Sequence, residues 1–82
     1  MMQVKVKFFA VARDAAGHDE CLLTLPDGST ASTALDQLIV QHPRLKEWRD
    51  HLAIAVNLNY VSRDNVLRPG DEIAVIPPVS GG

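Results

Sequence analysis

The chain closes with the stretch Glu72-Ile73-Ala74-Val75-Ile76-Pro77-Pro78-Val79-Ser80-Gly81-Gly82. After Glu72, residues 73–76 form an apolar run of the kind found in strands. Proline has no N–H group to donate to a neighbouring strand, so the sheet should end before Pro77 and the chain should leave it as an extended arm. The stretch therefore predicts a folded domain over residues 1–76 and an extended tail over residues 77–82.

The tail is suited to carry a reactive group to another protein. Six extended residues span roughly 20 Å, and glycine fits into passages where any Cβ would clash. We therefore expect the α-carboxylate of Gly82 to be the reactive group, delivered to a partner through Pro77, Pro78, Val79, Ser80 and Gly81. The alternative is a frayed tail without chemistry, because a pair of glycines alone is a weak signal.

The composition is that of one small globular domain. The 82 residues are 46% hydrophobic and 22% charged, with a net charge of −2. This balance argues against a general binder of nucleic acid or of acidic membranes. The single cysteine, Cys21, cannot form an internal disulfide, and no run approaches the ~20 apolar residues of a membrane span. We therefore expect a cytoplasmic protein.

Three elements are predicted in the first part of the chain. Apolar residues of 3–9 recur at every second position, which predicts a half-buried strand. Phe9 lies on the face of this strand that carries two lysines. Residues 10–16 are rich in helix formers, and Gly17 can end a short helix there. Residues 20–25 alternate again and predict a second strand.

The middle of the chain predicts the main helix. Ser29 or Thr30 can cap it after a turn rich in proline and glycine. Pro43 should end it, and a short helical segment over residues 44–52 should pack Trp48 on the core. The apolar stripe of the main helix falls at helical spacing on Ala31, Ala34, Leu35, Leu38 and Ile39.

The remaining residues predict three more strands. Residues 60–61 should form a short strand after a tight turn within residues 57–59, and a turn at residues 68–71 should precede the final strand. One main helix cannot cover both faces of such a sheet. The sequence therefore predicts an α+β domain with a mixed four- or five-stranded sheet on one helix and a far face open to partners. The strand over residues 53–58 alternates and should carry Ile54, Val56 and Leu58 on one face.

No catalytic or metal-binding apparatus is visible in the sequence. His18, His42 and His51 are not spaced as metal ligands, and with one cysteine no usual zinc site can be assembled. Cys21 lies among strand apolar residues, where a lone cysteine is more often a small buried hydrophobe than a nucleophile. We therefore expect that the chain binds no metal and no cofactor by itself.

Four segments that together span the chain carry a resemblance to a known family. On these motifs the chain resembles the small sulfur-carrier subunits of molybdopterin synthase, which are ubiquitin-like β-grasp sulfur carriers. The resemblance implies a β-grasp fold whose terminal glycine carries activated sulfur. The motifs are Phe8-Phe9-Ala10, Ala55-Val56-Asn57 with Tyr60-Val61, Gly70-Asp71-Glu72-Ile73-Ala74 and Pro77-Pro78-Val79-Ser80-Gly81-Gly82.

The resemblance implies a reaction cycle at Gly82. A ubiquitin-activating-type adenylyltransferase would use ATP to form an acyl-adenylate on its carboxylate, and a sulfur donor would convert this to a thiocarboxylate. The large subunit of molybdopterin synthase would then accept the tail and pass the sulfur to cyclic pyranopterin monophosphate. In this scheme the chain is the non-catalytic, sulfur-donating subunit of an enzyme complex.

The resemblance also implies a surface for these partners. Phe9 and Ile76 should form an apolar patch on neighbouring strands, with Tyr60 nearby, and contact the large subunit. Exposed apolar patches commonly mark interfaces, although single surface aromatics are normal. A heterotetramer with the large subunit is implied, and we expect a monomer when the chain is alone.

Other functions fit the same fold. The chain could carry sulfur for thiamine, tRNA thiolation or cysteine synthesis, or serve as a modifier that forms isopeptide bonds. A further possibility, from a different class, is a non-catalytic β-grasp interaction module whose tail does no chemistry. The motif at residues 8–10 and the two prolines favour molybdopterin.

Overall fold

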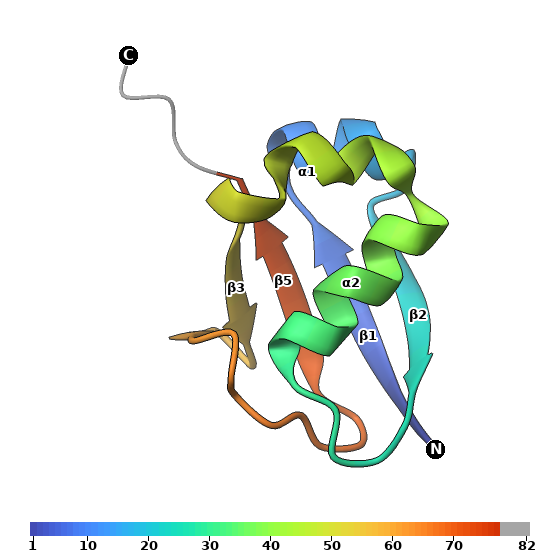
Figure 1. The fold of residues 1–82 in the computed structure, drawn as a ribbon, viewed down its shortest axis with the longest axis vertical. Coiled ribbons are helices and arrows are strands. Elements are labelled where there is room, and N and C mark those ends of the chain that lie inside the picture. Colours follow the sequence, from blue (N-terminus) through green and yellow to red (C-terminus); the bar gives the residue numbers. More distant parts are fainter. Residues whose placement is uncertain (78–82) are drawn as a thin grey trace.

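The computed structural model describes residues 1–77, whose fold is shown in Figure 1. The short helix at residues 10–16 and the strands at residues 20–25 and 72–76 have the predicted bounds. The tail residues Pro78, Val79, Ser80, Gly81 and Gly82 lie outside the described part. The elements in chain order are β1 (Met2–Phe8), α1 (Ala10–Ala16), β2 (Glu20–Leu25), α2 (Ala31–Gln41), the 3-10 helix η1 (Pro43–His51), β3 (Ala53–Val56), β4 (Asn59–Val61) and β5 (Glu72–Ile76).

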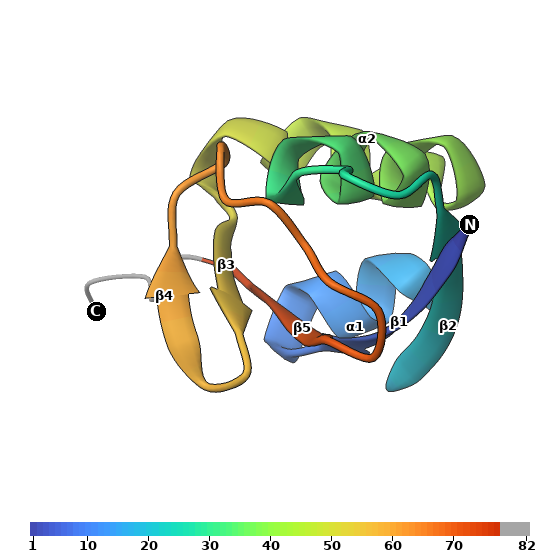
Figure 2. The same cartoon turned by 90° about the horizontal axis from the view of Figure 1, so that it is seen from below.

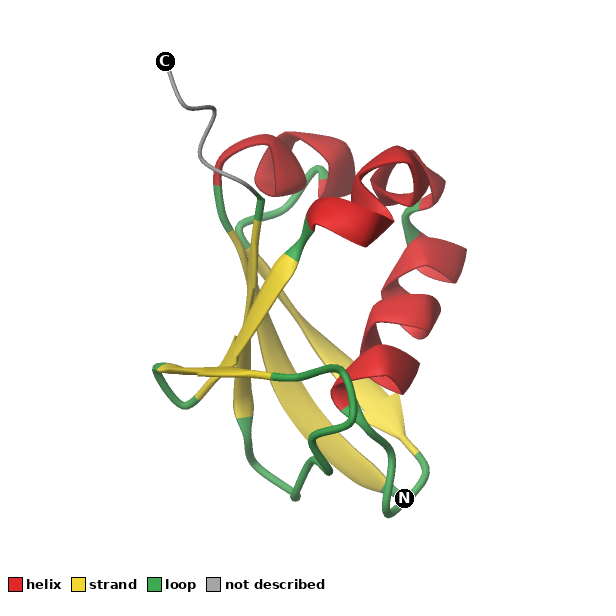
Figure 3. Cartoon of the chain, turned by 60° about the vertical axis from the view of Figure 1, so that its left-hand side comes forward, coloured by secondary structure: helices red, strands yellow, loops and turns green. Residues whose placement is uncertain are grey.

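The five strands form one mixed sheet with the order β2-β1-β5-β3-β4. β1 and β5 run parallel, and the other neighbouring pairs run antiparallel. α2 lies across one face of this sheet in Figures 1 and 3, and the view in Figure 2 shows α2 apart from the strands. This is the predicted two-layer α+β architecture, with five strands in the sheet.

The core lies between the sheet and α2. Along β1 the buried side chains alternate with accessible ones, as the period of a strand requires. The predicted stripe of α2 faces them: four of its residues are buried, and Ile39 packs partly buried against the same cluster. The large side chains that are most completely buried are Leu23, Leu25, Leu35, Leu38, Leu45, Ile73, Val4, Val6 and Val75.

The ends of the two α-helices follow from local chemistry. Thr30 is the N-cap of α2, and its hydroxyl accepts a hydrogen bond from the N–H group of Thr33 at 3.3 Å. Ser29, the other predicted cap, instead donates its hydroxyl to the carbonyl of Pro26 at 2.7 Å. α1 ends at Gly17, whose φ of 78° lies in the left-handed region that glycine tolerates best.

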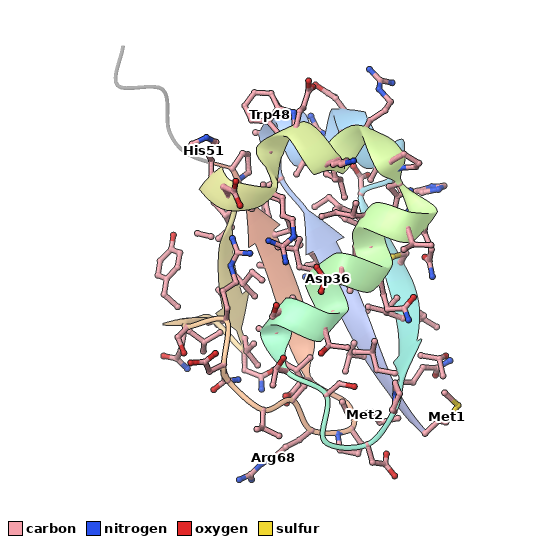
Figure 4. All side chains as sticks on the ribbon, viewed as in Figure 1. Met1, Met2, Asp36, Trp48, His51 and Arg68 are labelled. Atoms are coloured by element: carbon pink, nitrogen blue, oxygen red, sulfur yellow. The ribbon has the colours of Figure 1, made fainter. Side chains whose placement is uncertain are left out.

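The segment predicted as a short helix over residues 44–52 is the 3-10 helix η1. Trp48 is half-buried on η1 and packs against the core, as predicted. Arg49 fastens η1 to α2, because its guanidinium donates to one carboxylate oxygen of Asp36 from Nε at 3.2 Å and from Nη2 at 2.7 Å. Figure 4 places Trp48 and His51 at the end of the molecule where β5 ends.

The prediction for Leu58 was wrong. Residues 53–58 do not form one strand: β3 stops two residues earlier, and Asn57 and Leu58 make the turn into β4 with φ values of 50° and 74°. Leu58 is 94% exposed and does not face the core. The Asn57 amide holds this turn, since it donates to Asp71 Oδ1 at 3.0 Å and accepts from the N–H group of Glu72 at 3.0 Å.

Candidate functional site on the outer face of the sheet

The face of the sheet that is directed away from α2, hereafter the outer face, brings Phe9 and Ile76 together. Phe8 is paired with Val75 in the parallel register of β1 and β5, so the residues that follow them are neighbours. The N–H group of Phe9 also donates to the carbonyl of Val75 at 3.3 Å. Phe9 is 47% exposed and Ile76 is half-buried. The geometry therefore places an aromatic and a branched aliphatic side chain at the end of β5.

A second row of residues crosses the outer face, two residues before Phe9 on β1 and two residues before Ile76 on β5. The strand registers align Lys7 with Ala74, Ala74 with Ala55, and Ala55 with Tyr60. Tyr60 is 73% exposed on β4, and β3 separates it from β5. The three predicted contact residues thus share one face, but alanine methyl groups lie between Tyr60 and the other two.

The chain leaves β1 through a strained backbone at Ala10, which follows Phe9 and has a φ of 50°. This conformation is unusual for a residue with a Cβ, and it turns the chain directly into α1. The carbonyl of Phe9 then accepts the N–H group of Ala12 at 3.0 Å. Phe9 is therefore held at the junction of a strand and a helix, where its backbone has little freedom.

The end of β5 is fixed from both sides. Ile76 is paired with Ala53 of β3, and Pro77 is buried although it was predicted to belong to the tail. Arg63 secures the start of β3, because its Nη2 donates to the carbonyl of Leu52 at 2.9 Å. The last described residues of the chain are thus anchored in the sheet, beside the apolar residues of the outer face.

One ion pair lies on the outer face. Lys7 Nζ lies 3.1 Å from Glu72 Oε1, and both side chains are about two-fifths exposed, at 39% and 41%. Pairs this exposed add little stability. Besides the predicted contact residues Phe9, Ile76 and Tyr60, the outer face carries Leu22, which is 62% exposed and pairs with Lys5 in the β1–β2 register.

The described residues offer no alternative chemistry of the usual kinds. Burial raises the pKa of the Cys21 thiol, which keeps it in the less nucleophilic protonated form at neutral pH. In residues 1–77 no three His, Cys, Asp or Glu side chains are placed to hold a metal ion. None of the helices in this part of the chain is long and apolar enough to cross a membrane.

Two features of the surface were missed from sequence. The His18 and His42 rings pack edge to face with centroids 5.8 Å apart, which their separation in the chain gave no reason to expect. Leu58 is exposed in the predicted tight turn and does not share the buried face of Ile54 and Val56. Asparagines at positions 57 and 59 flank this leucine, and they are the signal from which the turn was predicted.

Comparisons with known proteins identify the family of the chain. Residues 6–82 match the model of the ThiS family. The "Molybdopterin synthase sulfur carrier subunit" of Arabidopsis thaliana is 38% identical over 99% of this chain and 84% of its own length. The protein of the same name from Chlamydomonas reinhardtii is 41% identical over 99% of this chain and all of its own length.

Solved structures show the same fold. A putative molybdopterin converting factor, subunit 1, from Pyrococcus furiosus superimposes with a TM-score of 0.87 and 37% identity, covering 96% of this chain and all of its own. The complex of subunits 1 and 2 of the molybdopterin-converting factor from Helicobacter pylori contains a chain that matches with a TM-score of 0.69 and 29% identity, covering 99% of this chain and all of that one.

Two further structures delimit the fold family. Small archaeal modifier protein 1 from Methanosarcina acetivorans matches with a TM-score of 0.83 and 31% identity over all of this chain and 98% of its own. A ubiquitin from Caldiarchaeum subterraneum matches with a TM-score of 0.66 at 14% identity over 99% of this chain and 98% of its own, which shows the ubiquitin-like fold alone. The chain is thus a ubiquitin-like β-grasp protein and belongs to the ThiS family, together with the molybdopterin synthase sulfur carrier subunits.

Proposed function

We propose that the chain is the sulfur carrier of a molybdopterin synthase. The observation that carries the proposal is the whole-length similarity to proteins named for this role, at 38% and 41% identity. The match to subunit 1 in a complex with subunit 2 of a molybdopterin-converting factor supports a large-subunit partner. The chain would act as the sulfur-donating subunit and leave catalysis to that partner.

The chemistry takes place at the carboxylate of Gly82. A carboxylate oxygen attacks the α-phosphate of ATP on an activating enzyme of the ubiquitin-activating type, which forms an acyl-adenylate and releases pyrophosphate. The terminal sulfur of a donor persulfide then attacks the acyl carbon and AMP leaves, and a thiol cleaves the resulting acyl disulfide, which yields the thiocarboxylate and a disulfide on the donor. In the large subunit the thiocarboxylate gives its sulfur to cyclic pyranopterin monophosphate, and the Gly82 carboxylate returns when water supplies the oxygen.

The outer face of the sheet is the proposed docking surface. Phe9 and Ile76 lie side by side where β5 ends, so a partner that covers them is positioned to receive the residues that follow. A partner of this kind recognises the folded body by its apolar face, whereas the reaction uses only the terminal atoms. We further propose that two copies of the chain bind two large subunits, and that the chain binds no cofactor of its own.

Mass spectrometry of the intact protein from its native host tests the proposal. A fraction of molecules should carry one sulfur in place of one C-terminal oxygen, and this fraction should disappear when the activating enzyme is deleted. An extension by one residue after Gly82 is the matched control, since it blocks the carboxylate and leaves the folded domain unchanged. Unaltered cofactor production in the extended variant would contradict the sulfur-carrier role.

A second function, protein modification, is favoured by the match to small archaeal modifier protein 1. It would use the same acyl-adenylate, but the acyl carbon would finally be attacked by a lysine amine, with formation of an isopeptide bond. An immunoblot of the native host separates the two functions. Higher-mass conjugates that vanish in the Gly82 extension would support modification, and their absence would leave the carrier role alone.

A further inference from the structure

Leu58 combines two unfavourable features at one position. Its φ of 74° lies in the left-handed region, which a residue with a Cβ adopts only under strain. Its side chain is 94% exposed to water. Glycine at the second position of a two-residue turn would remove both features. Strain that persists at an exposed apolar residue indicates a function rather than a contribution to folding.

The turn presents Leu58 in a fixed position. The backbone N–H group of Asn57 donates to the carbonyl of Glu72 at 2.8 Å, and the Asn57 amide bonds to both Asp71 and the N–H group of Glu72. Asn59 adds a hydrogen bond from its amide to the carbonyl of Asn57 at 3.2 Å. A side chain on so constrained a turn loses little backbone freedom when it is bound.

Backbone strain lies along the margin of the outer face. Within residues 1–77 the non-glycine residues with positive φ are Ala10, Asn57 and Leu58. Ala10 follows Phe9, and Leu58 stands two residues before Tyr60. Ala10 thus adjoins Phe9, and the turn at Asn57 and Leu58 leads through Asn59 into Tyr60, so both strained segments border the proposed docking surface.

The surroundings of Leu58 indicate the chemistry of its partner. An open hollow of about 270 Å³ is lined by Asn57, Leu58 and Glu72. The Glu72 carboxylate remains 41% exposed while it pairs with Lys7. A partner element that covers this hollow meets one large apolar side chain and one accessible negative charge. An apolar pocket with a lysine or arginine at its edge is complementary to both.

The hollow and the end of β5 fit within one interface. Glu72 and Ile76 are four residues apart on β5, which corresponds to about 13 Å along the strand. A protein–protein interface of ordinary size covers roughly 800 Å² of each partner. A partner seated on Phe9 and Ile76 therefore reaches Leu58 without an enlarged contact.

We propose that Leu58 is an anchor residue for binding of the large subunit. Its side chain enters an apolar pocket of that subunit, and a lysine or arginine at the edge of the pocket faces Glu72. This inference rests on the proposed function, because it takes the large subunit as the occupant of the outer face. It adds a contact at the end of the face opposite to Phe9 and Ile76, and it assigns a role to a residue that contributes nothing to the core.

Binding of the purified large subunit from the same organism, measured by calorimetry, tests the anchor. Leu58→Gly should weaken binding about ten-fold, while its Tm stays unchanged or rises by up to about 5 °C because the strain is removed. Leu58→Met should bind like the natural protein. Glu72→Gln should weaken binding about three-fold. Val40→Ala changes another exposed apolar residue, on α2, and should have no effect.

The outcomes separate the anchor from the proposed function. If Phe9→Ala weakens binding and Leu58→Gly does not, the anchor is overturned and the proposed docking surface stands. If Leu58→Gly lowers Tm together with affinity, Leu58 has a structural role and the anchor is overturned. If the natural protein dimerises through Leu58, a second copy is the occupant and the proposal also fails. If the natural protein does not bind the large subunit at all, the proposed function itself is contradicted.

Discussion

Phe9 is held by its backbone, so its side chain can be changed without disturbing the fold. Its N–H group bonds to Val75 and its carbonyl bonds to Ala12, whereas the ring is 47% exposed. An aromatic ring in this situation contributes more to a partner than to the core. Apolar surface on a rigid element of this kind is typical of residues that dominate binding energies.

We expect Phe9→Ala to weaken association with the large subunit about ten-fold or more. The Tm of the domain should change little, because the ring is only partly buried. Calorimetric titration measures the first quantity and thermal unfolding the second. Val40→Ala, which truncates a 75% exposed residue on α2, away from the outer face, is the control. Equal affinities of Phe9→Ala and the natural protein would remove Phe9 from the docking surface.

Asn57 joins two turns that are far apart in the chain. Its amide contacts Asp71 and Glu72, and its own φ of 50° is one that asparagine tolerates better than most residues. We expect Asn57→Ala to lower the free energy of unfolding by about 1–3 kcal/mol, since it loses the hydrogen bonds and retains the strain. Urea unfolding measures the change.

Two variants separate the causes at this position. Asn57→Gly restores the backbone freedom without the amide and should recover part of the stability lost in Asn57→Ala. Asn59→Ala removes a single exposed hydrogen bond and should cost less. If Asn57→Ala unfolds at the same urea concentration as the natural protein, the hydrogen bonds to Asp71 and Glu72 do not hold the turn.

At the scale of elements, a histidine lies where α2 meets η1. His42 is the C-cap of α2 and the N-cap of η1, and its ring packs on Phe8 with centroids 5.7 Å apart. Burial lowers the pKa of His42, and the nearby His18 lowers it further. The charged form of His42 is therefore less favourable in the folded domain than in the unfolded chain.

The stability of the domain should fall in acid because His42 becomes protonated more readily in the unfolded chain. A group whose pKa is lowered on folding contributes stability above its unfolded pKa of about 6.5, and the contribution is lost as the pH falls below that value. We expect the urea midpoint to decrease between about pH 7.5 and pH 5. His42→Asn should reduce this dependence, whereas His51→Asn, at an exposed position, should not. An identical pH profile for His42→Asn would contradict the assignment.

Most elements could be predicted because glycine and proline mark their ends. Gly17 closes α1 and Pro43 follows α2, so the bounds of these helices needed no tertiary information. The tight turn within residues 57–59 was predicted, but the end of β3 before it was not, because Asn57 is held by bonds to residues 14 and 15 positions away. Local alternation therefore extended the strand over residues 53–58 too far.

The candidate site was predictable in part. That Phe9 lies beside Ile76 followed from the resemblance, since the parallel pairing of β1 and β5 leaves no mark in local sequence. The position of Tyr60 depended on strand order, which puts β3 between β4 and β5. Hydrophobic alternation shows which face a residue occupies, but it does not show which strands are neighbours.

At the scale of the whole molecule, the chain buries its core against one face of the sheet and keeps apolar groups on the other. The outer face remains a mixture of small apolar groups, paired charges and a few large side chains, with Phe9 and Tyr60 the most exposed aromatics. Large apolar side chains that are separated by small and charged groups do not favour stable self-association of the isolated chain.

We therefore expect the chain alone to sediment as a single species of 8.9 kDa. Addition of the large subunit should shift it completely into a larger complex, and the mass of that complex gives the stoichiometry. Analytical ultracentrifugation at several concentrations makes both measurements. A dimer of the isolated chain that Phe9→Ala dissolves would mean that the outer face first serves contacts between copies.

The place of β5 in the middle of the sheet has a mechanical consequence. It is bonded along its length to β1 on one side and β3 on the other, and Pro77 after it is buried. A pull on the C-terminal end acts along β5, so its hydrogen bonds are loaded together in shear and do not open one after another. An enzyme that pulls on the C-terminal end would thus meet a folded domain that resists unfolding. The domain would remain outside the enzyme while the end of the chain enters it.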